Sequence, residues 1–271
     1  AVHVEGRHGC HNWVLHRPPV VDGGAGVVVF FPGDITDTCG ESCQDYRYSA
    51  ESLFWIVSSK YPSHHVVAVR PRMVYEMFAL YLNFLNVDQM GNPRAELRED
   101  PIAADHLVKL LSKVGIASEE RITLVGFSKG CVVLTELMRC AETGAGAALL
   151  SRIEAMHFLD PGLMQPPVFR ISEEETAAFA RVCGGRFPIF MHGSPRQLDD
   201  ANRPFVGENV LEFCTWLRNV GLPVSQHRYG SGEPSLNMHF DVIHCFRRSD
   251  VDEEFGPHCA GFFDKWAKSS V

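Results

Sequence analysis

Short apolar runs alternate with longer segments of helical periodicity along most of this chain. Val27 to Phe31 is an unbroken apolar run, and Val66 to Val69 is another. Such runs are typical of strands that are covered on both faces, as in a parallel sheet between helices. The same reading predicts further strands at 12–16, 121–127, 153–159, 187–191 and 224–229.

Helical spacing of apolar residues predicts the segments between these strands. Expected helices cover 50–60, 100–115, 131–141, 173–182, 208–220 and 253–268, and another begins near His239. Asp100-Pro101 is a helix-start signal, because an N-cap carboxylate precedes proline at the first helical position. Alternating strands and helices imply right-handed crossovers and a mostly parallel sheet with helices on both faces. We expect a single α/β domain over 1–271, with cap-like insertions at 71–98 and 161–186.

The sequence Gly-Phe-Ser-Lys-Gly at 126–130 joins a predicted strand to a predicted helix. This is a G-x-S-x-G nucleophile elbow in its expected context, where flanking glycines let backbone segments pass closely. The tight turn exposes the Ser128 hydroxyl above the sheet edge and points a helix N-terminus at the reacting centre. The elbow predicts a nucleophilic Ser128 in a positive-φ conformation.

The acid of a Ser-His-Asp triad has several candidates. Reactive groups gather at the carboxyl ends of parallel strands. Asp160 follows the strand after the elbow, and Asp200 lies in the loop after the next strand, which is the usual hydrolase position. We expect Asp200 to be the acid, with Asp160 as the alternative and Asp199 third.

The base must follow the last strand if the triad has the order expected for this fold. His239, His244 and His258 qualify. His239 is favoured because it starts a helical segment after a glycine-containing loop, and His258 is the main alternative. Oxyanion-hole amides are expected from Asp34, after the Pro32-Gly33 turn, and from Lys129.

Composition narrows the function classes. The chain has 271 residues, of which 45% are hydrophobic and 21% charged, enough for a large core. We expect no integral membrane segment, because no long apolar span is present. The net charge of −8 disfavours a nucleic-acid partner.

Nine scattered cysteines, several of them in apolar runs, indicate a reducing compartment. The chain begins at Ala1 without Met, so we expect an upstream segment to have been removed.

The sequence contains no convincing motif for a metal ion or a nucleotide cofactor. The Cys39-x3-Cys43 pair beside Asp37 and Glu41 lacks a second paired motif and departs from an EF-hand spacing. Neither G-x-G-x-x-G nor a P-loop is present. We therefore expect no cofactor and no metal.

Three stretches together resemble a known family. They are 30–34 (Phe-Phe-Pro-Gly-Asp), 124–131 around the elbow, and 233–240, which ends in Met-His-Phe. From about 12 to 246 the chain resembles the eukaryotic family of the human chromosome 2 open reading frame 69 protein. This resemblance implies an α/β-hydrolase-like fold, a mitochondrial rather than cytoplasmic location, and a triad on Ser128, Asp200 and His239. The segment 247–271 departs from the family pattern.

Two functions compete. The leading hypothesis is a serine hydrolase that acts on a small-molecule or lipid ester or thioester through an acyl-enzyme. The alternative is a hydrolase-fold scaffold that binds a protein or lipid partner without turnover. The aromatic insertion at 71–98 and the irregular stretch at 161–186 suit the second role.

Overall fold

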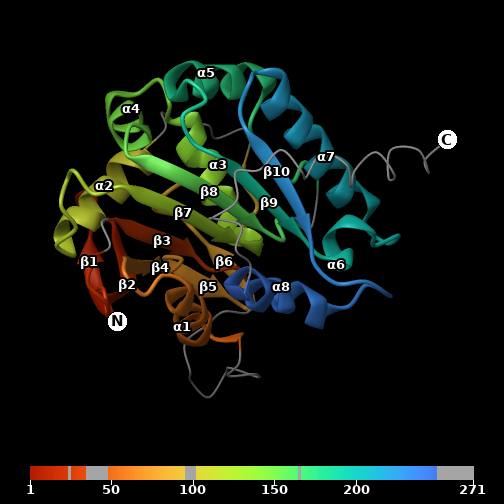
Figure 1. The fold of residues 1–271 in the computed structure, drawn as a ribbon, viewed down its shortest axis with the longest axis horizontal. Coiled ribbons are helices and arrows are strands. Elements are labelled where there is room, and N and C mark those ends of the chain that lie inside the picture. The colour runs from red at the N-terminus through yellow and green to blue at the C-terminus, as the bar shows by residue number, and fades with distance from the viewer. Residues whose placement is uncertain (24–25, 35–47, 95–101, 164–165, 249–271) are drawn as a thin grey trace.

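A twisted sheet forms the centre of the protein (Figure 1). The computed structural model describes residues 1–23, 26–34, 48–94, 102–163 and 166–248. Within them the sheet has eight strands in the order β1-β2-β4-β3-β7-β8-β9-β10. The strands are β1 (Val2–Glu5), β2 (His11–Arg17), β3 (Val27–Phe31), β4 (His65–Val69), β7 (Ile122–Phe127), β8 (Ile153–Leu159), β9 (Ile189–Gly193) and β10 (Val224–Arg228).

Pairing in this sheet is mostly parallel. Strands β4, β3, β7, β8, β9 and β10 all run the same way, whereas β2 pairs antiparallel with both β1 and β4. The predicted α/β class with a mostly parallel sheet is confirmed. Of the strands in this eight-stranded sheet, the apolar pattern missed β1, whose alternating and largely exposed residues give no continuous apolar run.

Helices cover both faces of the sheet (Figure 1). They are α1 (Ala50–Lys60), α2 (Ala103–Lys113), α3 (Cys131–Arg139), α4 (Gly144–Leu150), α5 (Glu173–Cys183), α6 (Pro195–Leu198), α7 (Pro204–Asn219) and α8 (Leu236–Arg248). Helix α2 begins at Ala103 with Ile102 as N-cap, later than predicted. Asp100 and Pro101, the predicted start, lie outside the described residues, as does the helix expected over 253–268.

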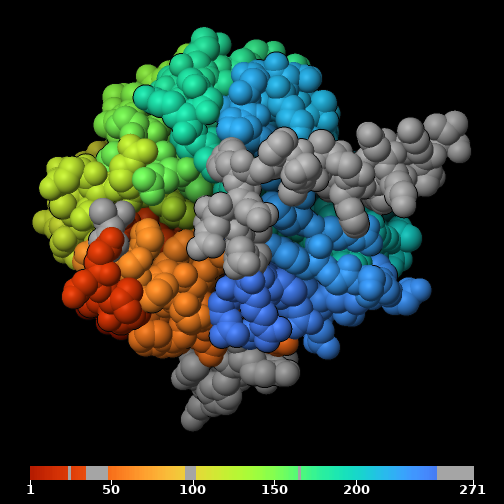
Figure 2. All heavy atoms as spheres, viewed as in Figure 1, coloured from red at the N-terminus to blue at the C-terminus, as the bar shows by residue number. Residues whose placement is uncertain are grey.

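The alternation of side chains along β3 divides the core in two. Val27, Val29 and Phe31 pack with α2, α3, α5 and α7, whereas Val28 and Phe30 pack with α1 and α8. Successive side chains of a strand point to opposite faces, so a strand that is apolar throughout joins both cores. Figure 2 shows α1 and α8 side by side over the second face.

The two predicted insertions contain regular structure. Strands β5 (Met73–Tyr75) and β6 (Phe78–Leu80) form an antiparallel hairpin within 71–98. Helix α5 lies within 161–186 and starts with a capping box formed by Ser172 and Glu175. Their role as caps remains a prediction.

Two expectations from composition can be compared with this fold. In the described ranges, no helix combines the length and apolar character needed to cross a membrane. The cysteines there are all free; they are Cys10, Cys131, Cys140, Cys183, Cys214 and Cys245.

Candidate active site

Ser128 lies on the turn between β7 and α3, as the elbow motif predicts. Its φ is 51°, so the prediction of a positive-φ serine is confirmed. A Cβ at position 130 would lie 2.0 Å from the carbonyl oxygen of Phe31, and one at 126 would lie 2.9 Å from Cys131 Cα. Only glycine permits this approach between the elbow, β3 and α3. The turn is therefore held in its strained form by packing on both sides.

His239 lies in the first turn of α8 and is paired with Asp160. Its Nδ1 is 2.7 Å from Asp160 Oδ2. A carboxylate accepts hydrogen bonds, so Nδ1 is the donor, and Nε2 of the neutral ring is then an acceptor. The imidazole also stacks on Phe127, with ring centroids 4.7 Å apart. This arrangement fixes both the tautomer and the plane of the ring.

Asp160 is fully buried at the end of β8. Ser194 donates twice to its carboxylate, from its amide to Oδ1 and from its hydroxyl to Oδ2, each at 2.6 Å. The side-chain amide of Gln197 donates to the Asp160 carbonyl oxygen at 3.1 Å. A buried carboxylate without such donors would be costly, so these contacts both stabilise and orient it.

Asp200 is not placed against His239, contrary to the sequence-based expectation. Its carboxylate is bound by the guanidinium groups of Arg196 and Arg203 and by the amide of Asn202, at 3.0 Å. The Asn202 amide, together with Arg203 and Arg196, holds the pKa of Asp200 below its usual value. The third candidate, Asp199, pairs with Arg228. The physical reason is that the chain turns into α6 right after β9, which brings Ser194 rather than Asp200 to the strand end.

The turn after β3 passes directly against the nucleophile. A Cβ on Gly33 would lie 2.6 Å from Ser128 Cβ and 3.2 Å from Ser128 Oγ. In the described part of the chain, the amides of Asp34 and Lys129 donate to no other residue. Within those residues, both amides are therefore available to donate to a substrate oxygen at Ser128.

The Lys129 side chain is almost completely buried behind the elbow. Its ammonium donates to the Met90 carbonyl oxygen at 2.6 Å and to Asn92 Oδ1 at 3.3 Å, and it lies 3.7 Å from Asp34 Oδ2. Burial lowers the pKa of Lys129 and raises that of Asp34, and their mutual attraction opposes both shifts. The Asp34 carboxylate also accepts from the Ala79 amide. The sequence predicted that the backbone amides of Asp34 and Lys129 lie near Ser128, but it did not predict the ion pair between their side chains.

Ser128 and His239 line one cavity of about 240 Å³. The structure records no hydrogen bond between them within the described residues. Such contacts between nucleophile and base often form only when substrate is bound. The cavity is lined by Asp34, Met77, Phe78, Ser128, Gly162, Leu163, Arg196, Gln197, Arg203, Leu236, His239 and Phe240.

Of the other histidine candidates and the metal motif, His244 alone can be placed relative to this cavity. His244 lies further along α8 and does not line it. His258, Cys39 and Cys43 lie outside the described residues. Among those described, no group of three or more His, Cys, Asp or Glu side chains is arranged to hold a metal ion.

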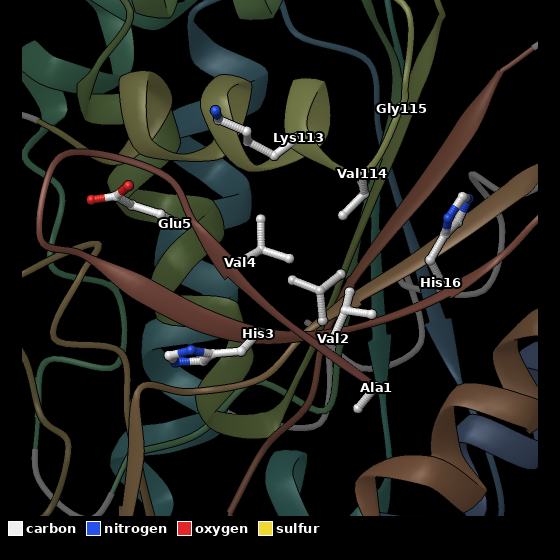
Figure 3. Close-up of a pocket in the computed structure, with 10 residues that line it drawn as sticks. Ala1, Val2, His3, Val4, Glu5, His16, Lys113, Val114 and Gly115 are labelled. Carbon is white, nitrogen blue, oxygen red and sulfur yellow. The ribbon is translucent and has the colours of Figure 1, made fainter.

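A larger hollow of about 790 Å³ lies elsewhere. Figure 3 shows that its walls come from β1, from His16 of β2 and from the end of α2. It contains none of the predicted catalytic residues, so size alone does not identify the active site.

Sequence reasoning missed the residues that support the acid. Ser194 and Gln197, like Arg196 and Arg203, lie where the sequence pattern predicts a loop and no function. A usable signal was present: Ser194 follows β9 directly, and β9 is the neighbour of β8, which ends at Asp160. Polar residues at adjacent strand ends meet at the same sheet edge.

Comparison with known proteins identifies relatives. The model of the C2orf69 family matches residues 1–119 and 115–223. The mitochondrial protein C2orf69 homolog of Danio rerio is 28% identical over 251 residues, which cover 81% of this chain and 72% of the relative. The Homo sapiens mitochondrial protein C2orf69 is 24% identical over 81% of this chain and 74% of its own length. The family-model match ends before α8, so it does not include His239.

Several similar solved structures are named as peptidases or esterases. An acylaminoacyl peptidase from Pyrococcus horikoshii superposes with a TM-score of 0.54 at 14% identity, over 93% of this chain. This chain spans only 40% of that peptidase. Esterase Est22 superposes with a TM-score of 0.51 at 14% identity, over 91% of this chain and 75% of the esterase. At such identities the likeness shows the α/β-hydrolase fold alone.

Proposed function

This chain belongs to the C2orf69 family, and we propose that it is a serine hydrolase that cleaves an ester or thioester through an acyl-enzyme. Its relatives are named as mitochondrial proteins, which supports a mitochondrial location. One observation carries the proposal. His239 lines the same cavity as the strained Ser128 and is hydrogen-bonded to the buried Asp160 carboxylate.

In the proposed reaction Ser128 is the nucleophile and His239 the base. His239 Nε2 takes the hydroxyl proton as Ser128 Oγ forms a bond to the carbonyl carbon, and the carbonyl π electrons move to oxygen. Collapse of that oxyanion expels the alcohol or thiol, which receives the proton from Nε2. A water molecule then attacks the acyl-enzyme in the same way and releases the acid and free Ser128.

Asp160 takes the role of the triad acid in place of Asp200. It keeps the proton of the neutral ring on Nδ1 and stabilises the imidazolium that forms during attack. The amides of Asp34 and Lys129 are the proposed oxyanion donors. The nearby Asp34 carboxylate would oppose negative charge, and its pairing with the Lys129 ammonium reduces that cost.

A fluorophosphonate probe tests this proposal, because it reacts only with an activated serine. We expect the wild type to be labelled at Ser128 and to hydrolyse p-nitrophenyl esters, and Ser128→Ala to do neither. Ser58→Ala is the matched control, since Ser58 is also buried but lies on α1. Equal labelling of wild type and Ser128→Ala, or no labelling of folded wild type, would overturn the enzyme assignment.

The second candidate is a scaffold that binds a protein or lipid without turnover. The β5–β6 hairpin favours it, because Met73, Tyr75 and Met77 are about half exposed and Met77 also lines the cavity. Binding energy from such a patch needs no contact between Ser128 and His239. A scaffold would keep its partner in Ser128→Ala and lose it when Met77 is replaced by Ser.

A further inference from the structure

Two arginines line the cavity that contains Ser128 and His239. Arg196 is on α6 and Arg203 precedes α7, and their side chains are 32% and 20% exposed. Both bind the single Asp200 carboxylate, so the group carries a net positive charge. Among the other lining residues in the described ranges, Asp34 is the one carboxylate, and it is paired with Lys129.

Arg196 has unused hydrogen-bond donors. A guanidinium has five N–H groups, and in the described chain Arg196 donates only through Nη1, to Asp200. Its Nε and Nη2 groups have no protein acceptor there. Arg203, by contrast, also donates to the Arg196 carbonyl oxygen and to Gln197 Oε1. Arg203 therefore stabilises the loop, whereas Arg196 has N–H groups that could bind a ligand.

The position of Arg196 is fixed relative to the triad. Its neighbours Ser194 and Gln197 both donate to Asp160, and Asp160 in turn holds His239. A Cβ at Gly162 would lie 2.3 Å from the Gln197 side-chain nitrogen, so this short helix is packed tightly against the strand end. A group bound to Arg196 would thus be held at a defined place relative to the catalytic residues.

We propose that the substrate carries an anionic group, a carboxylate or a phosphate, which Arg196 binds while the scissile carbonyl lies at Ser128. This rests on the proposed hydrolase function and names its substrate class. Guanidinium is the cation best suited to carboxylate and phosphate, because two N–H groups can bind one anion side by side. Phe78, Leu163 and Phe240 line the same cavity and suit the carbon chain between the two groups. The small volume of about 240 Å³ favours a short substrate.

The test compares esters that differ only in the distal charge. Monomethyl glutarate is paired with methyl pentanoate, and acetyl glycolate with ethyl acetate, so that the charge is placed on the acyl side or on the leaving group. A third arm uses 2-acetoxyethyl phosphate, an acetate ester whose alcohol carries a phosphate in place of the carboxylate. We expect kcat/KM to be about 10- to 100-fold higher for the charged member of at least one pair, as one charge-assisted contact provides.

Arg196→Gln should lower the ratio of kcat/KM for each charged ester to kcat/KM for its neutral partner to about one. Arg196→Lys should restore part of the preference for the charged ester, because the charge remains but the paired geometry is lost. Arg228→Gln is the matched control: Arg228 is also 32% exposed and also paired with one aspartate, but it does not line the cavity. An equal loss in both glutamine variants, or a wild type that prefers the neutral esters in all arms, would overturn the proposal.

Binding to Ser128→Ala separates this inference from the catalytic one. Calorimetry with monomethyl glutarate should show binding to Ser128→Ala that is lost in the Ser128→Ala/Arg196→Gln double variant. If this binding is seen but the wild type hydrolyses no ester, the anion site is supported and the hydrolase assignment is wrong. If the wild type hydrolyses neutral esters but binding does not depend on Arg196, the hydrolase assignment is supported and the anion site is wrong.

Discussion

Asp160 and Asp200 follow adjacent strands of one sheet, yet their surroundings differ in kind. Asp160 at the end of β8 is bound by neutral donors, the amide and hydroxyl of Ser194, and by His239. Asp200 beyond β9 is bound by two arginines and a backbone amide. Both carboxylates are buried. Burial alone therefore does not distinguish a catalytic carboxylate from a structural one.

The two carboxylates differ in how strongly each can attract a protonated histidine. A carboxylate already neutralised by two guanidinium groups has little further attraction for an imidazolium. One held only by neutral donors keeps its full charge for that partner, and the low dielectric around it strengthens the interaction. The comparison therefore favours Asp160 over Asp200 as the acid of the proposed triad and gives Asp200 a role in loop stability.

The largest expected effect comes from removing the Asp160 charge. Asp160→Asn should lower kcat for esters by about 10⁴-fold, because the amide cannot fix the same tautomer of His239. The measurement is kcat for p-nitrophenyl acetate, with circular dichroism to confirm folding. Asp200→Asn is the comparison variant. If Asp200→Asn loses more activity than Asp160→Asn while both are folded, the two roles are reversed.

A smaller effect is expected at Ser194, which supports Asp160. Ser194→Ala removes the hydroxyl donor but keeps the amide donor, so kcat should fall by about 10-fold, as for one hydrogen bond to a charged group. Ser194→Thr retains a hydroxyl and should recover part of the activity. Steady-state kinetics on neutral esters give the answer. Unchanged kcat in Ser194→Ala would show that the amide alone orients Asp160.

Asp200 should matter for stability rather than turnover. Asp200→Asn leaves Arg196 and Arg203 without their carboxylate, and the free energy of unfolding should fall by about 1–3 kcal/mol. Its kcat for neutral esters should stay within about threefold of wild type. Urea titration measures the first quantity. Asp199→Asn is the control, because its more exposed pair with Arg228 should contribute about 0–1 kcal/mol.

The smallest effect is a pH dependence of that stability. Hydrogen bonds from Asn202, with Arg203 and Arg196, lower the pKa of Asp200 in the folded protein. A lowered folded-state pKa stabilises the protein above the unfolded value of 3.8 and ceases to do so as pH falls through the folded value. The stability difference between wild type and Asp200→Asn should therefore be similar at about pH 7 and 5 and shrink near pH 3. A difference that grows on acidification would contradict this assignment.

The fold was largely predictable from local sequence. Continuous apolar runs identified the strands buried on both faces, such as β3 and β4, because both sides of such a strand face a core. The elbow was predictable too, since its glycines report close backbone approach. The hairpin β5–β6 and the edge strand β1 were missed, because their exposed side chains follow no apolar pattern.

The pairing of the site was less predictable. Nothing in the residues around Asp160 or Asp200 states which one His239 reaches, because that depends on the direction of the loop after β9. Proline at position 195 starts α6 at once and turns Ser194 toward β8. The sequence also does not show that the Asp200 carboxylate is paired with two arginines. Arg196 and Arg203 are near Asp200 in the chain, but only the structure shows that they bind it.

The buried pair of Lys129 and Asp34 has a consequence for how this chain changes over generations. Either residue alone, once lost, leaves a buried charge beside the nucleophile without its partner. Replacement of both by neutral residues removes the problem, so the two positions are expected to substitute together, as a double-mutant cycle on Lys129→Met and Asp34→Asn would reveal. Substitutions at position 34, in the loop after β3, are therefore expected to accompany substitutions at position 129, the residue after Ser128.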